Sequence, residues 1–349
     1  MKHGVYILEE GTALTAPITS GSSIQVVIGT APVHMVEDPA AVVNVPILAN
    51  SAAEAMAALG YVDDFENFTL CQTMYATNNL FQVSPVVYIN VLDPSKHNKA
   101  MTTASVEVEL LQAKIAEKGV IPSMLTVQNG EQTLVAGTDY TTEFDTDGSL
   151  LINLISGGKG QNAQTLTVSG KVVDPSVVTK TDIIGSYNAA NGKETGMELI
   201  RQVYPKLGVV PGLLLAPGWS QEPEVGIALA AKAANINGVF KAMAIIDLDT
   251  STATKYTDVK ETKENSGFTS EFCYPLWLSF RVGDYIFAGS AVAAALIAYT
   301  DASNDDVPSI SPSNKLMGIT GTCLADGTEV NLDQDQANVV NSYGVATAL

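Results

Sequence analysis

The sequence is poor in charged residues, and most of those present are acidic. Asp, Glu, Lys and Arg make up 16% of the 349 residues, whereas a soluble domain usually contains about a quarter. The 18 Lys and Arg residues stand against 37 Asp and Glu residues, for a net charge of −19. Phosphate binding needs clustered Lys and Arg, so neither a nucleic acid nor an anionic membrane surface is expected as a partner. The shortage of charge predicts that other copies of the chain cover much of the surface.

Long apolar runs are also absent. No stretch reaches the roughly 18 uninterrupted apolar residues of a transmembrane helix, so no membrane insertion is expected. The longest candidate, Ala288 to Tyr299, predicts a core helix instead. Glu9 and Glu10 interrupt any signal-peptide core, so no export signal is expected. Three scattered cysteines predict buried free thiols rather than a disulfide framework: Cys71, Cys273 and Cys323.

The residues that usually carry catalysis are sparse and badly spaced. The three histidines have no partner at metal-ligand spacing, so no metal site is expected at His3, His34 or His97. Neither Ser220 nor Ser290 lies in a G-x-S-x-G motif, and no histidine follows them. No cofactor is expected, and the sequence argues against an enzyme.

One carboxylate pair keeps two interpretations open. Asp247 and Asp249 follow a predicted strand, where many α/β folds place metal-binding or catalytic carboxylates. They also lead directly into Thr250 and Ser251, so helix capping explains them equally well.

The segments on either side of residues 103–180 alternate strand and helix patterns. Gln25 to Ile28 and Pro85 to Val91 predict buried strands, the second of the parallel-sheet type. Ser51 and Glu54 form a capping box that opens a helix closed by Gly60. The alternation continues with a helix capped by Thr195 and Glu198, a strand at 212–216, a helix at 225–234, a strand at 240–247, a polar helix at 251–264 and a strand at 276–280. This order predicts an α/β core with a mixed sheet and flanking helices, over residues 25–102 and 181–349.

Between these segments the pattern changes to short strands. Runs with strand character lie at 106–110, 124–127, 132–135, 140–144, 150–155 and 166–168. Asn129-Gly130 is a strong hairpin signal, and Asp145 to Gly148 separates the next pair of runs. The spacing predicts an inserted all-β sandwich or barrel domain over residues 103–180. Such insertions are tolerated where the two ends lie close together at an exposed loop.

A further short strand pattern precedes the core. It consists of Gly4, Val5, Tyr6, Ile7, Leu8 and Glu9. The residues that follow it are rich in Gly, Ser, Thr, Ala and Pro and predict a flexible linker, so residues 1–24 form an N-terminal arm. The strand either forms an edge of its own domain or adds to the sheet of a neighbouring subunit.

The order of these segments resembles the tail sheath proteins of contractile phages and of related bacteriocin-like injection devices. The matching stretches are Gly4 to Pro32 for the arm and first core strand, Thr126 to Leu154 for the inserted domain, Asp182 to Tyr187, Thr195 to Ile200, Val209 to Ser220 and Ala230 to Asp249 for the core, and Ser311 to Lys315 for a late core loop. Each stretch alone is a weak signal, whereas the series in order is specific.

The resemblance implies a structural subunit without a cofactor. Sheath subunits stack as hexameric rings around an inner tail tube protein, between a baseplate and a tail terminator. They assemble in a metastable state and contract to drive the tube through the target envelope. Their N- and C-terminal arms add strands to neighbouring cores, which favours a neighbour's sheet for Gly4 to Glu9. The location implied is a virion tail, after synthesis in the host bacterial cytoplasm.

Some points stay open. Similar sheath chains continue beyond the position that corresponds to Leu349, with another core segment and a C-terminal arm; Asp333 to Ser342 predicts a capped helix, and Gly344 to Leu349 the start of a strand. One alternative is another self-assembling tube or shell protein, which would lack the long and short states of a sheath in electron microscopy. The other is an α/β hydrolase-like enzyme, for which a pocket lined by Asp247, Asp249 and a serine would be needed.

Overall fold

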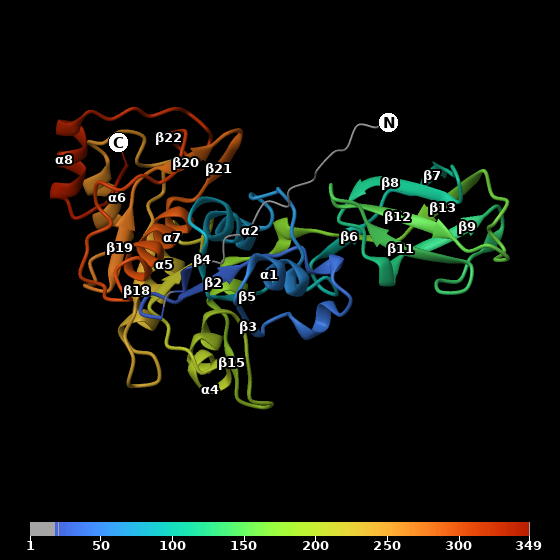
Figure 1. The fold of residues 1–349 in the computed structure, drawn as a ribbon, viewed down its shortest axis with the longest axis horizontal. Helices are drawn as coiled ribbons and strands as arrows, with labels where there is room; N and C mark the ends of the chain where they lie inside the picture. The colour runs from blue at the N-terminus through green and yellow to red at the C-terminus, as the bar shows by residue number, and fades with distance from the viewer. Residues whose placement is uncertain (1–17, 20, 349) are drawn as a thin grey trace, which may run out of the picture.

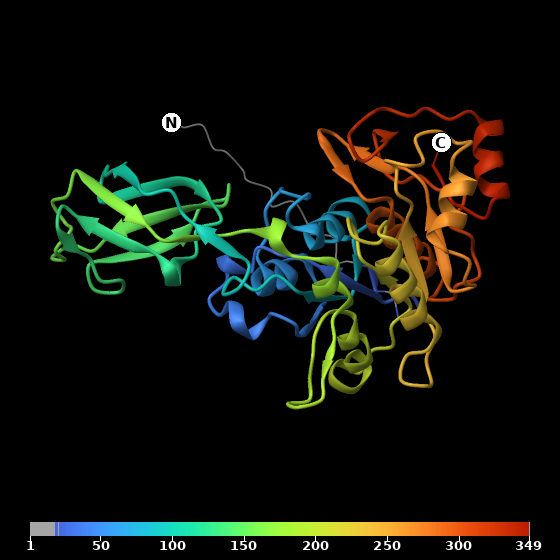
Figure 2. The ribbon, with the colours of Figure 1, turned by 180° about the vertical axis from the view of Figure 1, so that it is seen from behind.

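A computed structural model describes residues 18–19 and 21–348. These residues form an α/β core and, to one side of it, a separate group of antiparallel strands, drawn in teal and green (Figures 1 and 2). The strand group spans residues 104–169 and is called the β region below.

A six-stranded sheet organises the core. Its order is β19 (Cys273–Leu276), β18 (Met243–Asp247), β17 (Leu213–Leu215), β2 (Gln25–Gly29), β5 (Val86–Asn90) and β3 (Pro46–Ala49). Neighbouring strands are parallel except β3, which is antiparallel to β5. Every residue of β2 and β5 is buried, as expected for parallel strands covered on both faces. The predicted mixed sheet is therefore confirmed.

Helices from distant parts of the sequence pack on this sheet. α7 (Gly289–Ala302) contacts β2, β17 and β18 and packs beside α2 (Thr69–Tyr75). α5 (Pro223–Ala234) contacts β17 and β18 and packs beside α3 (Lys180–Ile184), while α1 (Ala52–Leu59) packs on β3. The small side chains of α7 are buried on nearly all sides, which confirms the predicted core helix. Within the described part of the chain, no helix is long and apolar enough to cross a membrane.

Capping residues set several helix ends as predicted. The Ser51 side chain accepts a hydrogen bond from the Glu54 N–H at 3.2 Å, and Gly60 ends α1 with a φ of 74°. α8 (Gln334–Ser342) begins at a capping box between Asp333 and Gln336. The capping box predicted at Thr195 is wrong. Gly196 follows it with a φ of 55°, outside the helical region, and the chain continues as a 3₁₀ helix (Gly196–Gln202) into the short α4 (Val203–Leu207).

Two other boundaries differ from the predictions. The polar helix α6 (Val259–Ser266) starts later than predicted, because the Asp249 carboxylate accepts hydrogen bonds from the Ser251 N–H and hydroxyl and forms a turn there. The strand predicted at 276–280 is interrupted at Leu278, whose φ is 92°. Its second part becomes β20 (Ser279–Val282), in a sheet with β21 (Tyr285–Phe287) and β22 (Gly321–Cys323).

The β region contains two antiparallel sheets. One has the order β10 (Gln132–Thr133), β9 (Thr126–Asn129), β13 (Thr165–Ser169), β7 (Ala104–Glu107). The other has the order β11 (Tyr140–Phe144), β12 (Ser149–Leu154), β8 (Gln112–Lys118), and β8 was not predicted because only Ala113 and Ile115 face inward. Both predicted hairpins are confirmed, as β9–β10 and β11–β12. Both sheets contribute to one hydrophobic cluster, separate from that of the core: its members include Val106, Ile115, Val127, Ile152 and Leu166.

The connection between the two parts is a pair of short strands. β6 (Asn98–Ala100) and β14 (Lys171–Val173) pair antiparallel where the chain leaves and re-enters the core (Figure 1). The points where the chain leaves and re-enters the core are thus side by side, which is the geometry that an insertion requires.

Candidate functional site

The predicted strand-addition residues, Gly4 to Glu9, lie outside the described residues, but the segment after them is placed. β1 (Ile18–Thr19) pairs in parallel with β4 (Val83–Ser84). The N–H groups of Gly21 and Ser22 donate to the Asp306 carboxylate at 2.6 and 3.2 Å, and the Ser23 hydroxyl donates to Asp301. The prediction of a flexible linker is therefore wrong for residues 18–19 and 21–23. Residues 18–19 pair with β4, and two aspartates near the end of α7 accept hydrogen bonds from residues 21–23.

The edge strands of the core sheets differ in whether another segment of the chain pairs with them. The outer edge of β19 is occupied by the chain itself: the Trp277 N–H donates to the Ala346 carbonyl, and the Ala346 N–H donates to the Pro275 carbonyl, both at 2.9 Å. The strand predicted from Gly344 is reduced to this single bridge. β3 and β21 are outer strands with no further strand beside them in the described part of the chain, whereas β22, the other outer strand of the smaller sheet, has a single bridge from Cys323 to Glu329. Unpaired backbone groups at such edges can accept an added strand.

At the carboxyl end of β18, Asp247 holds three elements together. Its carboxylate accepts hydrogen bonds from the N–H and hydroxyl of Ser290, at 2.7 and 2.5 Å, and from the hydroxyl of Ser220, at 3.1 Å. Ser290 lies in the first turn of α7, and Ser220 follows β17. Burial raises the pKa of the Asp247 carboxyl above its usual range, while the bonds from the two serines act in the opposite direction.

The pocket that the enzyme alternative requires is present beside this group. A cleft of about 1090 Å³ lies at the carboxyl ends of the strands, where open α/β sheets often bind ligands. Asp247 and Asp249 both line it. The other carboxylates lining the cleft are Asp63, Asp64, Glu66, Asp284 and Asp326, and no described residue lining it is His, Lys or Arg.

The chemistry of a hydrolase is not assembled there by the described residues. Ser220 and Ser290 are fully buried and donate to the Asp247 carboxylate, so neither hydroxyl is paired with a histidine. His34 packs against aromatic rings, and the Nδ1 of His97 accepts the Asp93 N–H at 2.9 Å. In residues 18–19 and 21–348, no group of His, Cys, Asp and Glu side chains is arranged to hold a metal ion. Asp247 thus acts as an anchor for the sheet and α7, and Asp249 as a turn residue.

The β region contacts the core where β11 ends. The buried His34 ring lies between the ring of Phe68 in the core, 6.0 Å away between centroids, and the ring of Phe144 in β11, 5.5 Å away. The Nδ1 atom of His34 is buried and has no hydrogen-bond partner among the described residues. Burial lowers the pKa of His34 from 6.5 to about 4. A neutral, unsolvated imidazole therefore forms part of the joint between the two parts.

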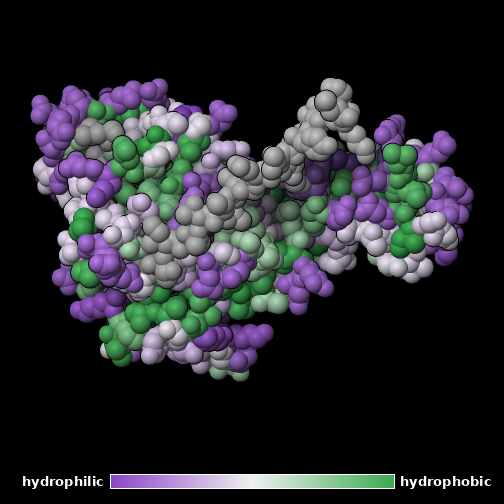
Figure 3. All heavy atoms as spheres, in the orientation of Figure 1, coloured by the Kyte–Doolittle hydropathy of each residue, from purple (hydrophilic) through white to green (hydrophobic). Residues whose placement is uncertain are grey.

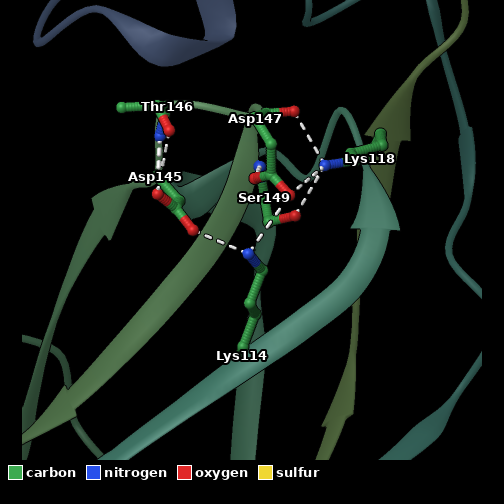
Figure 4. A network of polar contacts seen from close by, with 6 residues as sticks. All are labelled: Lys114, Lys118, Asp145, Thr146, Asp147 and Ser149. Carbon is green, nitrogen blue, oxygen red and sulfur yellow. Dashed lines mark hydrogen bonds and ion pairs between the residues drawn. The ribbon is translucent and has the colours of Figure 1, made fainter.

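Ion pairs hold the turn that follows Phe144 (Figure 4). The Nζ of Lys114 lies 2.6 Å from the Asp145 carboxylate and 3.1 Å from that of Asp147, and the Nζ of Lys118 lies 2.9 Å from Asp147. The lysine hydrogen bonds hold the pKa values of both aspartates below their usual range. All four side chains are substantially exposed, so these pairs fix the shape of the turn more than they add stability.

The His34 environment predicts a pH dependence. Because the pKa in the folded state is below that of the unfolded chain, the contribution of neutral His34 is complete above pH 6.5 and is lost as the pH falls towards 4. Between pH 7 and pH 5, the free energy of unfolding should fall by about 2 kcal/mol more in the wild type than in His34→Leu. Urea unfolding followed by tryptophan fluorescence at both pH values measures this difference. Equal pH dependence in the two proteins would contradict the assignment.

Comparison with known proteins finds similarity to tail sheath proteins. No protein-family model matches the chain. The chain is 26% identical to a tail sheath protein of Burkholderia phage BcepMu, over 99% of its own length and 71% of that protein. It is 32% identical to a putative prophage major tail sheath protein of Pseudomonas aeruginosa, over 48% of its own length and 42% of that protein.

Two solved structures have limited similarity to the chain. A chain in the baseplate of the anti-feeding prophage aligns with a TM-score of 0.48 at 12% identity, covering 99% of this chain and 64% of that one. A sheath tail protein of Listeria innocua aligns with a TM-score of 0.46 at 13% identity, covering 94% and 66%. The similarity in sequence extends over nearly the whole chain, as the order of its motifs predicted, and the chain is therefore similar to the phage tail sheath proteins.

Proposed function

We propose that this protein is a structural subunit of a contractile tail sheath, located in a virion tail, and that it works by self-assembly rather than by catalysis. The observation that carries the proposal is the 26% identity to a tail sheath protein over 99% of the chain. Two features of the chain support it. Charged residues are only 16% of the sequence, and the buried group of Asp247, Ser220 and Ser290 joins structural elements.

In this proposal the subunits form stacked hexameric rings around an inner tube, and contraction drives the tube through the target envelope. The core comprises residues 25–102 and 181–349, and residues 103–180 form an inserted β domain that projects from it. The partners are neighbouring sheath subunits, the tube protein, the baseplate and the tail terminator. Energy stored during assembly drives the movement, so neither nucleotide nor cofactor is needed.

The N-terminal arm is proposed to join subunits by strand addition. Gly4 to Glu9 would pair with an open sheet edge of a neighbour, and β3 and β21 are two such edges among the described residues. Main-chain hydrogen bonds supply the affinity in this mode. The joint then survives rotation of the cores, because it depends on a strand and not on contact between rigid surfaces.

Proline substitution tests the arm without shortening the chain. Val5→Pro combined with Ile7→Pro removes two N–H donors and should prevent tube formation, because an added strand needs those donors. The matched control, Val5→Thr with Ile7→Thr, keeps both donors and strand preference and should form tubes like the wild type. Negative-stain electron microscopy counts the tubes, and circular dichroism checks the core. Normal tubes from the proline variant would refute the arm's role, and a wild type with tubes of only one length would favour another tube protein.

A further inference from the structure

The turn between β7 and β8 has side chains that its backbone does not favour. Glu109 and Gln112 exchange two backbone hydrogen bonds, of 2.8 and 2.9 Å, so Leu110 and Leu111 are the central residues of a two-residue hairpin. Their φ angles are 50° and 68°, in the left-handed region that Asn and Gly adopt readily and leucine rarely does. Leu110 is fully exposed, and Leu111 is 40% exposed. Neither burial nor backbone preference accounts for two leucines here, and strained positions of this kind concentrate at functional sites.

The core carries an apolar groove with the composition of an interaction surface. It measures about 670 Å³ and includes Tyr204, Pro205, Val239 and Phe240 in its lining. Tyr204 and Phe240 lie 4.9 Å apart between ring centroids, yet Tyr204 is 46% exposed and Val239 is 75% exposed. Aromatic residues and arginine are enriched at the centres of protein interfaces. We call this surface the aromatic groove.

Charge makes the turn and the groove complementary. Glu107 and Glu109 precede the two leucines, and no Lys or Arg occurs between Lys99 and Lys114. The aromatic groove is lined by Arg201, which pairs with Glu194, and by Lys206, which has no ion-pair partner in the described part of the chain. An acidic apolar turn is repelled by an anionic membrane surface but suits an apolar groove with an unpaired cation.

The two surfaces lie on different parts of the molecule. The turn belongs to the β region, whereas the groove lies beside α4 and the loop before β18, on the core (Figures 1 and 2). Figure 3 shows apolar surface both on the β region and along the lower edge of the core. Contact between two different patches of identical chains is head-to-tail, so it joins copies into a ring or a helical filament.

We propose that the Leu110–Leu111 turn of one copy inserts into the aromatic groove of a second copy, with Glu109 next to Lys206. The inference rests on the proposed function only in taking another copy of the chain as the partner. It assigns to the β region a direct role in holding copies together.

Disulfide crosslinking between copies tests the contact. Leu110→Cys protein is mixed with tagged Val239→Cys protein, both carrying Cys273→Ser, because the remaining cysteines, Cys71 and Cys323, are buried. The mixture should give at least fivefold more tagged–untagged dimer than two control mixtures. In one control Val135→Cys replaces Leu110→Cys, and in the other Ile227→Cys replaces Val239→Cys; these residues are 53% and 48% exposed. Equal dimer yields in all mixtures overturn the proposal.

A second set of variants separates association from folding. Leu110→Asn with Leu111→Gly introduces the pair that this turn prefers, so the chain should fold at least as well, while self-association measured by sedimentation velocity should weaken at least tenfold. Glu109→Lys and Lys206→Glu should each weaken association, and their combination should restore it. Wild-type association in the Asn–Gly variant overturns the inference. If the wild type forms tubes and that variant does too, only this inference fails; if the crosslink forms but tubes never do, only the sheath function fails.

Discussion

Replacing Asp247 by alanine should lower the free energy of unfolding by about 3 kcal/mol. The substitution leaves three buried donors without an acceptor: the N–H and hydroxyl of Ser290 and the hydroxyl of Ser220. It also removes the carboxylate through which these bonds join the end of β18 to α7 and to the segment after β17. Urea unfolding followed by tryptophan fluorescence measures the loss, since the fully buried Trp277 reports on the core.

Asp247→Asn is the matched control. Its amide oxygen can still accept the Ser290 N–H, the serine hydroxyls can turn to accept from the amide nitrogen, and the substitution removes a buried acid whose pKa burial raises. It should therefore cost only about 1 kcal/mol. If the alanine and asparagine variants are equally stable, the hydrogen bonds at Asp247 do not hold the fold together as described.

Replacing Gly185 by alanine should be at least as damaging, at about 3 kcal/mol or more. Gly185 ends α3 with a φ of 74°, and a Cβ there would overlap the backbone carbonyl of Thr195. Neither backbone segment can move easily, because Thr195 also donates its N–H to the Ser186 carbonyl at 3.0 Å. Thermal unfolding monitored by circular dichroism should show the change.

Gly192→Ala separates the two causes of that loss, which are the left-handed backbone conformation and the overlap with the Thr195 carbonyl. Gly192 has a similar φ of 68°, but a Cβ there would meet no atom within 4 Å. It should therefore cost only the left-handed backbone penalty of about 1 kcal/mol. Similar losses at both glycines would show that backbone conformation alone, and not the contact with Thr195, makes Gly185 necessary.

Local sequence patterns predicted most of the elements and failed where distant residues decide. The buried strands β2 and β5, the Ala-rich helix α7 and the β11–β12 hairpin each carry their signal in consecutive residues. The helix expected after Thr195 failed because Gly196 is held in a left-handed conformation against residues of α3. The strand β8 was missed because only two of its seven residues are buried apolar side chains.

The site around Asp247 shows the same limit. The sequence singled out Asp247, Ser220 and Ser290 separately, but the serines are 27 and 43 residues from the aspartate. Only the sheet order, which places β17 beside β18 and α7 across both, brings them together. A motif search at fixed spacing has no access to that order, although an aspartate at the end of a strand and a serine at the start of a buried helix are each visible in the sequence.

The attachment of residues 18–19 and 21–23 also determines how mechanical load would enter the molecule. Tension on the chain ahead of Ile18 would first act along the parallel pair β1–β4, which resists as a shear joint. It would next reach the bonds from Gly21 and Ser22 to Asp306, and so the end of α7, before it reached β2. β2, inside the six-stranded sheet, would therefore be loaded only after these outer attachments.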